Sequence, residues 1–396
     1  MEKWETPAGR RAAVRLTGKG WRWQRTGHPW VYRDDLEGRP DLATGDLTTV
    51  LGPGDRFLGQ AFYSAASRIA LRFVTSQDEP VDRSFWQTRL RQAITYRGRV
   101  VQESDAYRLI YGEADGFPGL VVDSYAGHLV MQALHPAMER RTPEIVDLMM
   151  EELSPSSISL RNDAEVRLLE GLPLEVKTVR GELPRLVEVK EGGVRLWVDV
   201  LKGQKTGIYL DQRENRLVTA AWARGEVLDA FAYQGAFAMH LAPEARRVTL
   251  VDTSEAALAM ARENGRVNGF DNLEYVKANT FAFLKDAVGA GRRFDLIVLD
   301  PPAFAKSRGD RAGAVKGYRE INRRAFQLLN PGGILVTCSC SYNLSEPEFL
   351  EVVRHAAGEA NRRARVVERR GAARDHPGLL AMPESLYLKC LILMVD

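Results

Sequence analysis

The stretch from Val227 to Leu241 constrains the fold more than any other part of the chain. Two apolar residues precede Asp229, a loop with a single glycine follows, and an apolar helical pattern runs from Ala236 to Leu241. This order predicts a strand, a tight loop and a helix, the ligand-facing turn of a doubly wound α/β sheet. The G-x-G-x-x-G pattern that binds a pyrophosphate is absent. A ligand without a pyrophosphate is therefore favoured.

A second acid supports a nucleoside ligand. Val248-Thr-Leu-Val-Asp252 predicts a second strand that ends in a carboxylate, and Asp252 follows Asp229 by 23 positions. A carboxylate at this place can accept hydrogen bonds from both ribose hydroxyls of an adenosine. Together the two acids fit S-adenosylmethionine (SAM) better than NAD.

The region after about residue 195 alternates between strand and helix patterns, which predicts a Rossmann-like α/β domain. The ligand in such a sheet lies beyond the carboxyl ends of the strands. Polar residues follow several predicted strands, although each acid alone could equally be a helix N-cap. The predicted strands are 226–231, 248–252, 273–277, 294–299, 333–338 and 386–395. The polar strand ends are Asp229, Asp252, Asn279, Asp300 and residues 337–341.

The three cysteines differ in their predicted surroundings. Cys338 and Cys340 are two apart, so both would face the same way in an extended strand, and Cys340 lies nearer the carboxyl end. A thiol there becomes a nucleophile if its pKa is lowered by positive neighbours. Cys338 and Cys390 fit better as small packed core residues.

Composition favours a cytoplasmic, reducing location. Three cysteines form no disulfide framework, and no Cys/His spacing predicts a metal site. No apolar run is long enough to cross a bilayer, and the N-terminus lacks the apolar core of a signal peptide. The net charge is only +3, so electrostatic attraction to a partner must act locally.

The N-terminal region places arginines among aromatic residues. Four of the seven tryptophans fall in the first 30 residues, and Arg10–Arg33 contains seven cations and no acid. Cations suit phosphates and flat rings suit unpaired bases, which indicates RNA contact. A small β-barrel with large core side chains and solvated arginines explains the same composition equally well. The candidate RNA contacts are Arg22, Arg25, His28 and Trp30.

Two further candidates follow the predicted strand 294–299. Asp300-Pro-Pro fixes two φ angles beyond a buried strand, which holds the carboxylate in a defined position. Phe304 could stack on a substrate base. The basic loop with Lys306 and Arg308 could hold RNA phosphates. A surface loop with incidental charge is nearly as good an explanation.

At 396 residues the chain predicts several domains. A polar, proline-bearing stretch near residues 76–82 indicates a linker, and the pattern changes again near residue 195. We expect a β-barrel over 1–76, a central α+β domain over 77–194 and a catalytic domain over 195–396. The central domain should include a helix near 84–101, another near 142–153, and a hairpin that turns at Glu191-Gly-Gly193.

The motifs as a group resemble those of the bacterial large-subunit ribosomal RNA cytosine-5 methyltransferases, over nearly the whole chain. The resemblance implies a class I SAM-dependent domain preceded by an N-terminal PUA domain. It rests on the motifs Lys205-Thr-Gly-Ile-Tyr-Leu-Asp-Gln-Arg-Glu-Asn-Arg216, Asp229-x-Phe-x-Tyr-x-Gly-x-Phe237, Asp300-Pro-Pro-x-Phe304, Ser339-Cys-Ser341, Asp375-His-Pro377 and Tyr387-Leu-Lys389.

This resemblance also implies residue roles. Cys340 matches the family's nucleophile, which adds to C6 of the target cytosine, and Asp300 would bond the N3 and N4 edge of that base. Asp252 would bind the ribose of SAM. The methionine half would be lined by Asp229, Phe231, Tyr233 and Gly235, and the pocket closed by Tyr209, Asp211, Gln212 and Arg213.

One position departs from the family pattern. Asn279 stands where the family usually has an acid near the adenine amino group, and its carbonyl oxygen still offers an acceptor. The rival functions are formation of 5-methyluridine, methylation of another RNA base or of a small molecule, and RNA binding without turnover. The expected partner is large-subunit ribosomal RNA, and homodimer formation is left open.

Overall fold

The computed structural model describes residues 12–304 and 310–396. The chain forms two compact units, each assembled from segments that are distant in sequence. Unit 1 contains the chain up to Val187 together with Asp199–Ile208 and Asp375–Ser385. Unit 2 contains Glu188–Val198, Tyr209–Arg374 and Leu386–Asp396. No helix in the described part of the chain is both long and apolar enough to cross a membrane.

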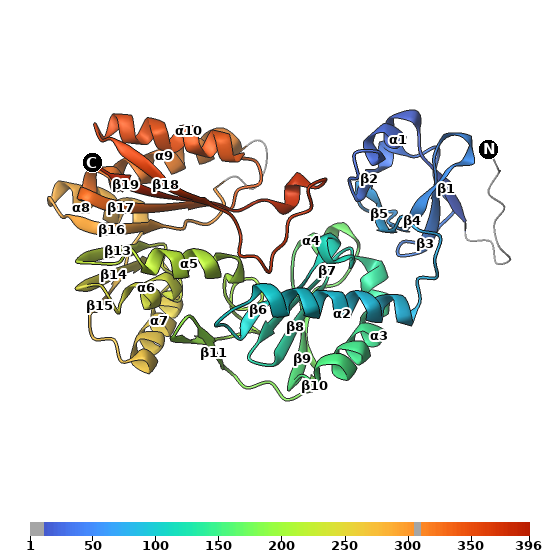
Figure 1. The fold of residues 1–396 in the computed structure, drawn as a ribbon, viewed down its shortest axis with the longest axis horizontal. Helices are drawn as coiled ribbons and strands as arrows, with labels where there is room; N and C mark the ends of the chain where they lie inside the picture. Colours follow the sequence, from blue (N-terminus) through green and yellow to red (C-terminus); the bar gives the residue numbers. More distant parts are fainter. Residues whose placement is uncertain (1–11, 305–309) are drawn as a thin grey trace. The chain divides into compact units, whose positions relative to one another are not determined.

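The first sheet of unit 1 has five strands in the order β1-β3-β4-β5-β2 (Figure 1). All neighbours are antiparallel except β1 and β3, and apolar side chains such as Val31, Val50 and Leu71 form its core. Its strands are β1 Ala13–Arg15, β2 Trp30–Tyr32, β3 Leu47–Leu51, β4 Phe57–Tyr63 and β5 Ile69–Thr75.

A helix lies within this region, where the sequence predicted a β-barrel. Helix α1 (Gly18–Gln24) contains two glycines, which are poor helix formers. Thr17 caps it by accepting a hydrogen bond from the Gly20 amide. A side chain at Gly20 would come within 2.3 Å of the Asp35 carbonyl oxygen, so glycine is required by a tertiary contact rather than by local propensity.

The second sheet of unit 1 also has five strands, in the order β10-β9-β8-β7-β6. Helices α2 and α3 contribute Trp86, Leu90 and Met138 to a core shared with this sheet. The predicted helices at 84–101 and 142–153 are thus confirmed, the second starting earlier. The elements are α2 Arg83–Val100, β6 Ala106–Tyr111, β7 Leu120–Tyr125, β8 His128–Ala133, α3 Pro136–Leu153, β9 Ser157–Asn162, α4 Val166–Leu169 and β10 Glu175–Gly181.

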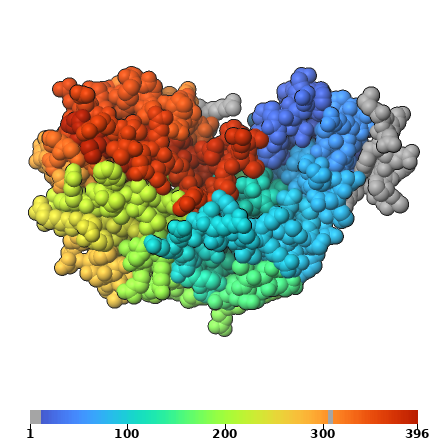
Figure 2. Space-filling model, in the orientation of Figure 1, coloured from blue at the N-terminus to red at the C-terminus, as the bar shows by residue number. Residues whose placement is uncertain are grey.

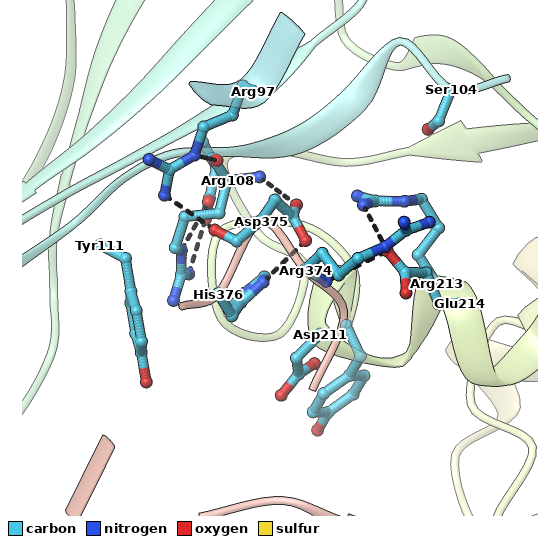
Figure 3. Close-up of polar contacts among 12 residues, drawn as sticks. Arg97, Ser104, Arg108, Tyr111, Asp211, Arg213, Glu214, Arg374, Asp375 and His376 are labelled. Carbon is cyan, nitrogen blue, oxygen red and sulfur yellow. Dashed lines mark hydrogen bonds and ion pairs between the residues drawn. The ribbon is translucent and has the colours of Figure 1, made fainter. Parts of the chain in front are cut away.

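The late segment Asp375–Ser385 belongs to unit 1 and is held there by buried polar groups. Figure 3 shows Arg97 and Arg108 directed toward Asp375. The Arg97 guanidinium donates to the Asp375 carbonyl oxygen at 2.8 Å, and the Arg108 amide donates to its carboxylate at 2.8 Å. His376 packs against Tyr111 with ring centroids 5.4 Å apart. The Asp375-His-Pro motif therefore anchors this segment.

Unit 2 contains a seven-stranded sheet in the order β15-β14-β13-β16-β17-β19-β18. The first five strands are parallel, and β19 is antiparallel to both of its neighbours. The strands are β13 Glu226–Ala230, β14 Arg247–Asp252, β15 Leu273–Lys277, β16 Phe294–Leu299, β17 Leu329–Ser339, β18 Ala364–Arg370 and β19 Lys389–Val395. This is the Rossmann-like sheet that the sequence predicted.

The strand order reverses between β13 and β16. The chain builds outward through β14 and β15, then returns to the other side of β13. Doubly wound sheets bind their ligands at such a point, beyond the carboxyl ends of the strands. Asp229 pairs with Val298 in the register, which places the end of β13 beside Asp300. The fold thus brings the predicted acids to one edge.

Helices cover both faces of this sheet. Figure 1 shows α9 and α10 on one face and α5, α6 and α7 on the other, and in Figure 2 the side chains of α9 and α10 close over their face. Tyr318, Phe326 and Phe349 are buried in the core between them and the sheet. The helices are α5 Arg213–Ala220, α6 Ala236–Leu241, α7 Glu255–Asn268, α8 Thr280–Gly289, α9 Arg311–Leu328 and α10 Glu346–Glu359.

Some predicted boundaries in unit 2 were wrong. Strand β17 begins at Leu329 instead of residue 333, and β19 begins at Lys389 instead of residue 386. The sequence analysis missed β18, whose residues are mostly arginine, glutamate and valine. As an edge strand it pairs only with β19 and needs no continuous apolar pattern.

The hairpin at Glu191-Gly-Gly193 is confirmed by strands β11 (Val187–Glu191) and β12 (Val194–Val198). Asn268 and Asn264 of α7 accept hydrogen bonds from the amides of β12 at Arg195 and Trp197. Most of the hairpin is therefore part of unit 2, although the sequence predicted it at the end of a central domain.

Candidate active site

The loop after β13 has an unusual backbone. Phe231, Tyr233 and Gly235 have φ values of 67°, 49° and 73°, a region that costs energy for residues with a side chain. The Phe231 amide donates to the Val251 carbonyl oxygen at 3.0 Å, and the Gly235 amide closes the turn on Ala232 at 2.8 Å. This network holds two aromatic residues in strained positions at the end of the strand, as ligand-binding loops often require.

Asp229 lies beneath that loop and is 1% exposed. Its carboxylate accepts a hydrogen bond from the Ala238 amide, in the first turn of α6, at 3.0 Å. Burial raises the pKa of Asp229 to about 7, and the nearby Asp300 and Asp252 act in the same direction. A cationic ligand next to such a buried acid would stabilise its charged form and lower its pKa.

Asp252 ends the adjacent strand and shapes the same loop. One carboxylate oxygen accepts from the Tyr233 amide at 2.9 Å and the other from the Ser254 amide at 2.8 Å. The ring of Tyr233 meets the ring of Tyr209 edge-on, with centroids 5.8 Å apart. The structure thereby joins Asp252, Tyr233 and Tyr209, three of the residues predicted to bind SAM.

Asp300 is held by a chain of polar side chains. The Gln212 amide nitrogen donates to the Asp300 carboxylate at 2.9 Å. Asn215 in turn donates to the Gln212 oxygen at 2.6 Å and accepts from Arg370 at 2.9 Å. The predicted residue Gln212 therefore orients the carboxylate, and its own orientation is fixed by residues that the sequence analysis did not single out.

A buried ion-pair triad supports the segment that carries Tyr209. Glu191 receives both nitrogens of the Arg216 fork at 2.6 and 2.7 Å and contacts His240 at 2.9 Å. Burial alone would raise the pKa of Glu191, but Arg216 and His240 outweigh it and the pKa is lowered. Arg216 also donates to the Tyr209 carbonyl oxygen at 2.9 Å. Sequence reasoning read Glu191 only as part of a turn.

The neighbouring predicted residues Asp211 and Arg213 are buried. The Asp211 carboxylate accepts a hydrogen bond from the Tyr387 hydroxyl, and its carbonyl oxygen accepts from the Ala373 amide at 2.8 Å. Arg213 begins helix α5, and Figure 3 draws it beside Glu214, which pairs with Arg374 at 3.1 Å. These contacts fix the turn between Tyr209 and α5.

The two cysteines of the Thr337–Ser341 segment are in different environments. Cys338 is fully buried and lies opposite Cys390 in the β17–β19 register, as predicted for core residues. A hydrogen bond with Cys390 and burial raise the pKa of Cys338 well above its ordinary value. Cys340 follows the end of β17 and is only half-buried. Cys338 is therefore held as a thiol in the core, while Cys340 lies at the rim.

Cys340 lies close enough to Tyr209, a predicted pocket residue, to affect its pKa. Burial raises the pKa of Tyr209, and the charges of Asp300 and Cys340 raise it further. Such coupling requires proximity, because charge effects fall with distance and with screening. The carboxylate, the thiol and the phenol thus share one edge of the sheet.

Lys389 is a site residue that the sequence analysis recorded only as part of a motif. It is 5% exposed and its ammonium donates to the carbonyl oxygens of Ser341 and Tyr387, both at 2.7 Å. Burial lowers the pKa of Lys389 to about 8, and Cys340 acts in the opposite direction. The available signal was a lysine within the apolar run Leu388–Leu393, where a buried charge needs a reason.

Two other predicted residues have partners within unit 2. Asn279 caps helix α8, because its side-chain oxygen accepts from the Ala282 amide at 3.2 Å. The ring of Phe304 packs against Tyr318 and Phe281 with centroids 4.7 and 5.7 Å apart. Their predicted contacts with adenine and with a substrate base remain predictions.

The four N-terminal candidates divide into exposed and packed residues. Arg22 and Arg25 are exposed, and Arg25 lies over the Trp21 ring at 5.1 Å. Trp30 is half-buried and donates to Glu113 at 2.7 Å. His28 is only 2% exposed and contacts Glu384 at 3.2 Å. The prediction that His28 touches RNA directly is corrected by this burial.

The remaining candidates, Lys306 and Arg308, lie outside the described residues. Within the described ranges, no group of three or more His, Cys, Asp or Glu side chains is arranged to hold a metal ion.

Comparison with known families gives two matches. A family of S-adenosylmethionine-dependent methyltransferases matches residues 160–390, and a family of PUA-like domains matches residues 14–76. The first match contains six strands of the seven-stranded sheet and ends within the seventh, β19, and the second contains the first sheet of unit 1 from Val14 onward.

Similar full-length proteins cover almost the whole chain. The ribosomal RNA large subunit methyltransferase I of Shewanella denitrificans is 39% identical over 380 residues, 93% of this chain and 95% of that protein. The protein of the same name from Vibrio cholerae is 38% identical over 374 residues, 91% and 94% of the two chains.

Solved structures show the same fold. A protein assigned as a methyltransferase and crystallised with SAH superposes with a TM-score of 0.84 at 20% identity, over 97% of this chain and 100% of that one. A protein from Streptococcus mutans assigned as a SAM-dependent methyltransferase gives a TM-score of 0.82, with the same identity and coverage.

Proposed function

Because the chain belongs to the SAM-dependent methyltransferases and, among them, to the ribosomal RNA large subunit methyltransferase I family, we propose that it methylates C5 of a cytosine in large-subunit ribosomal RNA through a covalent adduct with Cys340. SAM is the cofactor of this family. The single observation that carries the covalent route is the contrast between Cys338, locked in the core, and Cys340, half-buried at the rim.

The residues at the rim fit SAM. Asp229 is a buried acid without an ion-pair partner among the described residues, which suits the cationic end of the methionine part. Asp252 lies one strand further out, where a carboxylate can receive the ribose hydroxyls. Phe231, Tyr233 and Gly235 would line the methionine half, and Tyr209 would close the pocket. Bound SAM supplies the methyl group.

The chemistry proposed for the chain's own residues begins at Cys340. Its thiolate forms a bond to C6 of the cytosine, and the C5–C6 electron pair moves so that C5 becomes nucleophilic. After C5 has received its methyl group, loss of the C5 proton and departure of the thiolate restore the aromatic ring. Covalent catalysis of this kind divides one difficult step into easier ones.

Two charged side chains support this step. The Lys389 ammonium, bonded to the carbonyl oxygen next to Cys340, places positive charge near the sulfur and so favours the thiolate. The Asp300 carboxylate, oriented by Gln212, would accept from the N4 amino group of cytosine and from N3 once N3 is protonated. That bond is strongest in the adduct, where the ring carries the extra proton.

Contact with RNA is proposed for the exposed cations of the N-terminal sheet. Helix α1, which contains Arg22 and ends just before Arg25, has no acidic residue, and the Arg25 guanidinium lies over the Trp21 ring, 5.1 Å from its centroid. Guanidinium groups bind phosphates, and their contribution to affinity falls as salt rises. Together with the PUA-like match, this arrangement supports RNA rather than a small molecule as the substrate.

The test compares Cys340→Ala with Cys338→Ala, on large-subunit ribosomal RNA transcribed in vitro. We expect Cys340→Ala to remove methylation completely and to leave SAM affinity unchanged, because the thiol touches the base. Cys338→Ala should retain activity, at a stability cost of about 1 kcal/mol for a small buried side chain. Methylated nucleosides are identified by mass spectrometry and SAM affinity by calorimetry.

A second measurement examines the adduct directly. With SAM present and RNA that carries 5-fluorocytosine, the methylated C5 holds fluorine where it would otherwise lose a proton, so the thiolate cannot leave and the covalent complex should persist in denaturing gels. The complex should form with Cys338→Ala and not with Cys340→Ala. A methylated product from Cys340→Ala, or a product mass of 5-methyluridine, would show that the proposed reaction is wrong.

A further inference from the structure

Unit 2 exposes one aromatic ring beside the candidate nucleophile. Tyr342 is 65% exposed and follows Cys340 by two positions. Among the exposed large apolar side chains of the described residues, it alone carries a ring. Its ring stacks on that of Tyr387 with centroids 5.2 Å apart and planes inclined by 30°. We call Tyr342 and Tyr387 the tyrosine pair.

The backbone that carries Tyr342 is fixed by its neighbour Ser341. The Ser341 hydroxyl bonds to the Tyr318 hydroxyl at 3.0 Å, in the core of the unit. The Ser341 carbonyl oxygen accepts from the Lys389 ammonium at 2.7 Å and from the Leu344 amide at 3.3 Å. The turn after Cys340 is therefore held by the side chain of Ser341 and by its carbonyl oxygen.

Tyr387, on whose ring Tyr342 stacks, is held at its hydroxyl and at its backbone. Its hydroxyl donates to the buried carboxylate of Asp211, and its carbonyl oxygen accepts from Lys389 at 2.7 Å. Lys389 thus joins the backbone of Tyr387 to that of Ser341, the residue before Tyr342, through one ammonium. The exposed ring is presented on a support that is already ordered, so little conformational entropy is lost when something binds to it.

An exposed aromatic ring on a rigid support suits a flat ligand. Unpaired nucleobases stack on tyrosine, and this stacking tolerates any base because every base has a π face. An enzyme that takes one base out of a stack leaves its neighbours without a stacking partner. A ring two residues from the nucleophile is placed to replace that partner.

We propose that the tyrosine pair is a stacking site for the nucleobase next to the target cytosine. This inference rests on the proposed function, since it takes single-stranded RNA as the ligand. The pair offers a ring face rather than a pattern of donors and acceptors, so it stabilises the opened RNA without selecting its sequence.

The experiment measures binding of a short single-stranded RNA, about 12 nucleotides of cytidine, to the full chain in the presence of SAH. Tyr342→Ala should weaken binding about tenfold, and Tyr342→Phe, which keeps the ring, should stay within about twofold of wild type. Val366→Ala removes another exposed apolar side chain, on strand β18, and should change nothing. An RNA of the same length in which every position except one central cytidine is abasic should bind wild type and Tyr342→Ala alike.

Two outcomes would overturn the proposal: equal affinity of Tyr342→Ala and wild type for the intact RNA, or a loss in Tyr342→Phe as large as in Tyr342→Ala. Failure of wild type to bind the RNA would overturn it as well. Since Tyr342 is exposed, Tyr342→Ala should fold, and an unchanged melting temperature with SAH checks this.

Measuring the methylation activity of Cys340→Ala beside these titrations separates this inference from the proposed reaction. If Cys340→Ala still methylates RNA while the tyrosine variants behave as expected, the covalent route is wrong and the stacking site stands. If Cys340→Ala is inactive and Tyr342→Ala binds the RNA as wild type does, the stacking site is wrong and the covalent route stands.

Discussion

Unit 1 and the sheet edge of unit 2 each contain a buried aspartate, and the two differ in whether an arginine pairs with the carboxylate. In unit 1, Asp123 is completely buried and receives two nitrogens of Arg108 at 2.8 and 2.9 Å. At the rim, Asp229 is equally buried but accepts one backbone amide, and its pKa rises to about 7. A buried acid that is paired by the protein stabilises the fold, whereas one left for a ligand costs stability until the ligand arrives.

The largest expected effect comes from removing the charge of the paired acid. Asp123→Asn removes the buried charge that receives two nitrogens of the Arg108 guanidinium, and we expect a loss of about 3 kcal/mol in the free energy of unfolding. Thermal melting of the apo protein at pH 8 measures it. If Asp123→Asn melts like wild type, pairing in unit 1 is not what stabilises it, and the contrast with Asp229 fails.

The corresponding substitution at the sheet edge, Asp229→Asn, should raise the stability of the apo protein instead of lowering it. A folded-state pKa near 7, above the unfolded value of 3.8, means that stability is lost as pH rises toward 7 and that the loss is complete above it. Asp229→Asn removes this penalty. The melting temperature of the apo variant should therefore exceed that of wild type at pH 8, and the difference should shrink toward pH 4.

Binding of SAM should reverse that advantage. A cationic ligand lowers the pKa of Asp229, so binding releases a proton and the affinity of wild type should fall as pH drops below 7, by up to about tenfold per pH unit. Asp229→Asn should bind about 10- to 100-fold more weakly at pH 8 and lose the part of the slope that belongs to Asp229. Calorimetry in buffers of different ionisation enthalpy detects the released proton. No difference between the two proteins in proton release would contradict the proposed role.

The smallest effect is expected at Asn279, which caps α8 and ends a strand at the same edge. Asn279→Asp keeps a good cap, so stability should change by less than about 0.5 kcal/mol. If the position contacts adenine, the added carboxylate should alter SAM affinity by a few-fold. Asn279→Ala is the control for the cap, with an expected loss of about 1 kcal/mol. Equal SAM affinity in all three proteins would show that this position does not contact the cofactor.

Local patterns in the sequence were enough to predict the strand ends and hence the acids of the rim. Asp229, Asp252 and Asp300 each follow an apolar run, and parallel strands bring such ends together. Helix α1 and strand β18 could not be predicted in this way. The first depends on the close approach of Asp35 to Gly20, and the second is an edge strand whose order comes from β19.

The buried residues that hold the candidate site in place could not be predicted from the sequence either. Glu191 and His240 come from distant elements and meet only because the β11–β12 hairpin packs in unit 2. Lys389 follows Cys340 by 49 positions, and its ammonium reaches the Ser341 carbonyl oxygen only because β19 lies beside β17. No periodicity or spacing in the chain records such contacts.

The sequence by itself determined the sheet class, the acids at its edge and the place of Cys340 at the end of a strand, because strand patterns and the direction of parallel strands are local properties. Only the tertiary structure decided which buried charges are paired, that His28 is packed inside, and that the exposed ring of Tyr342 stacks on Tyr387. Burial and pairing depend on which distant segments come together, and the free energy of a charge or an aromatic ring is set by those neighbours.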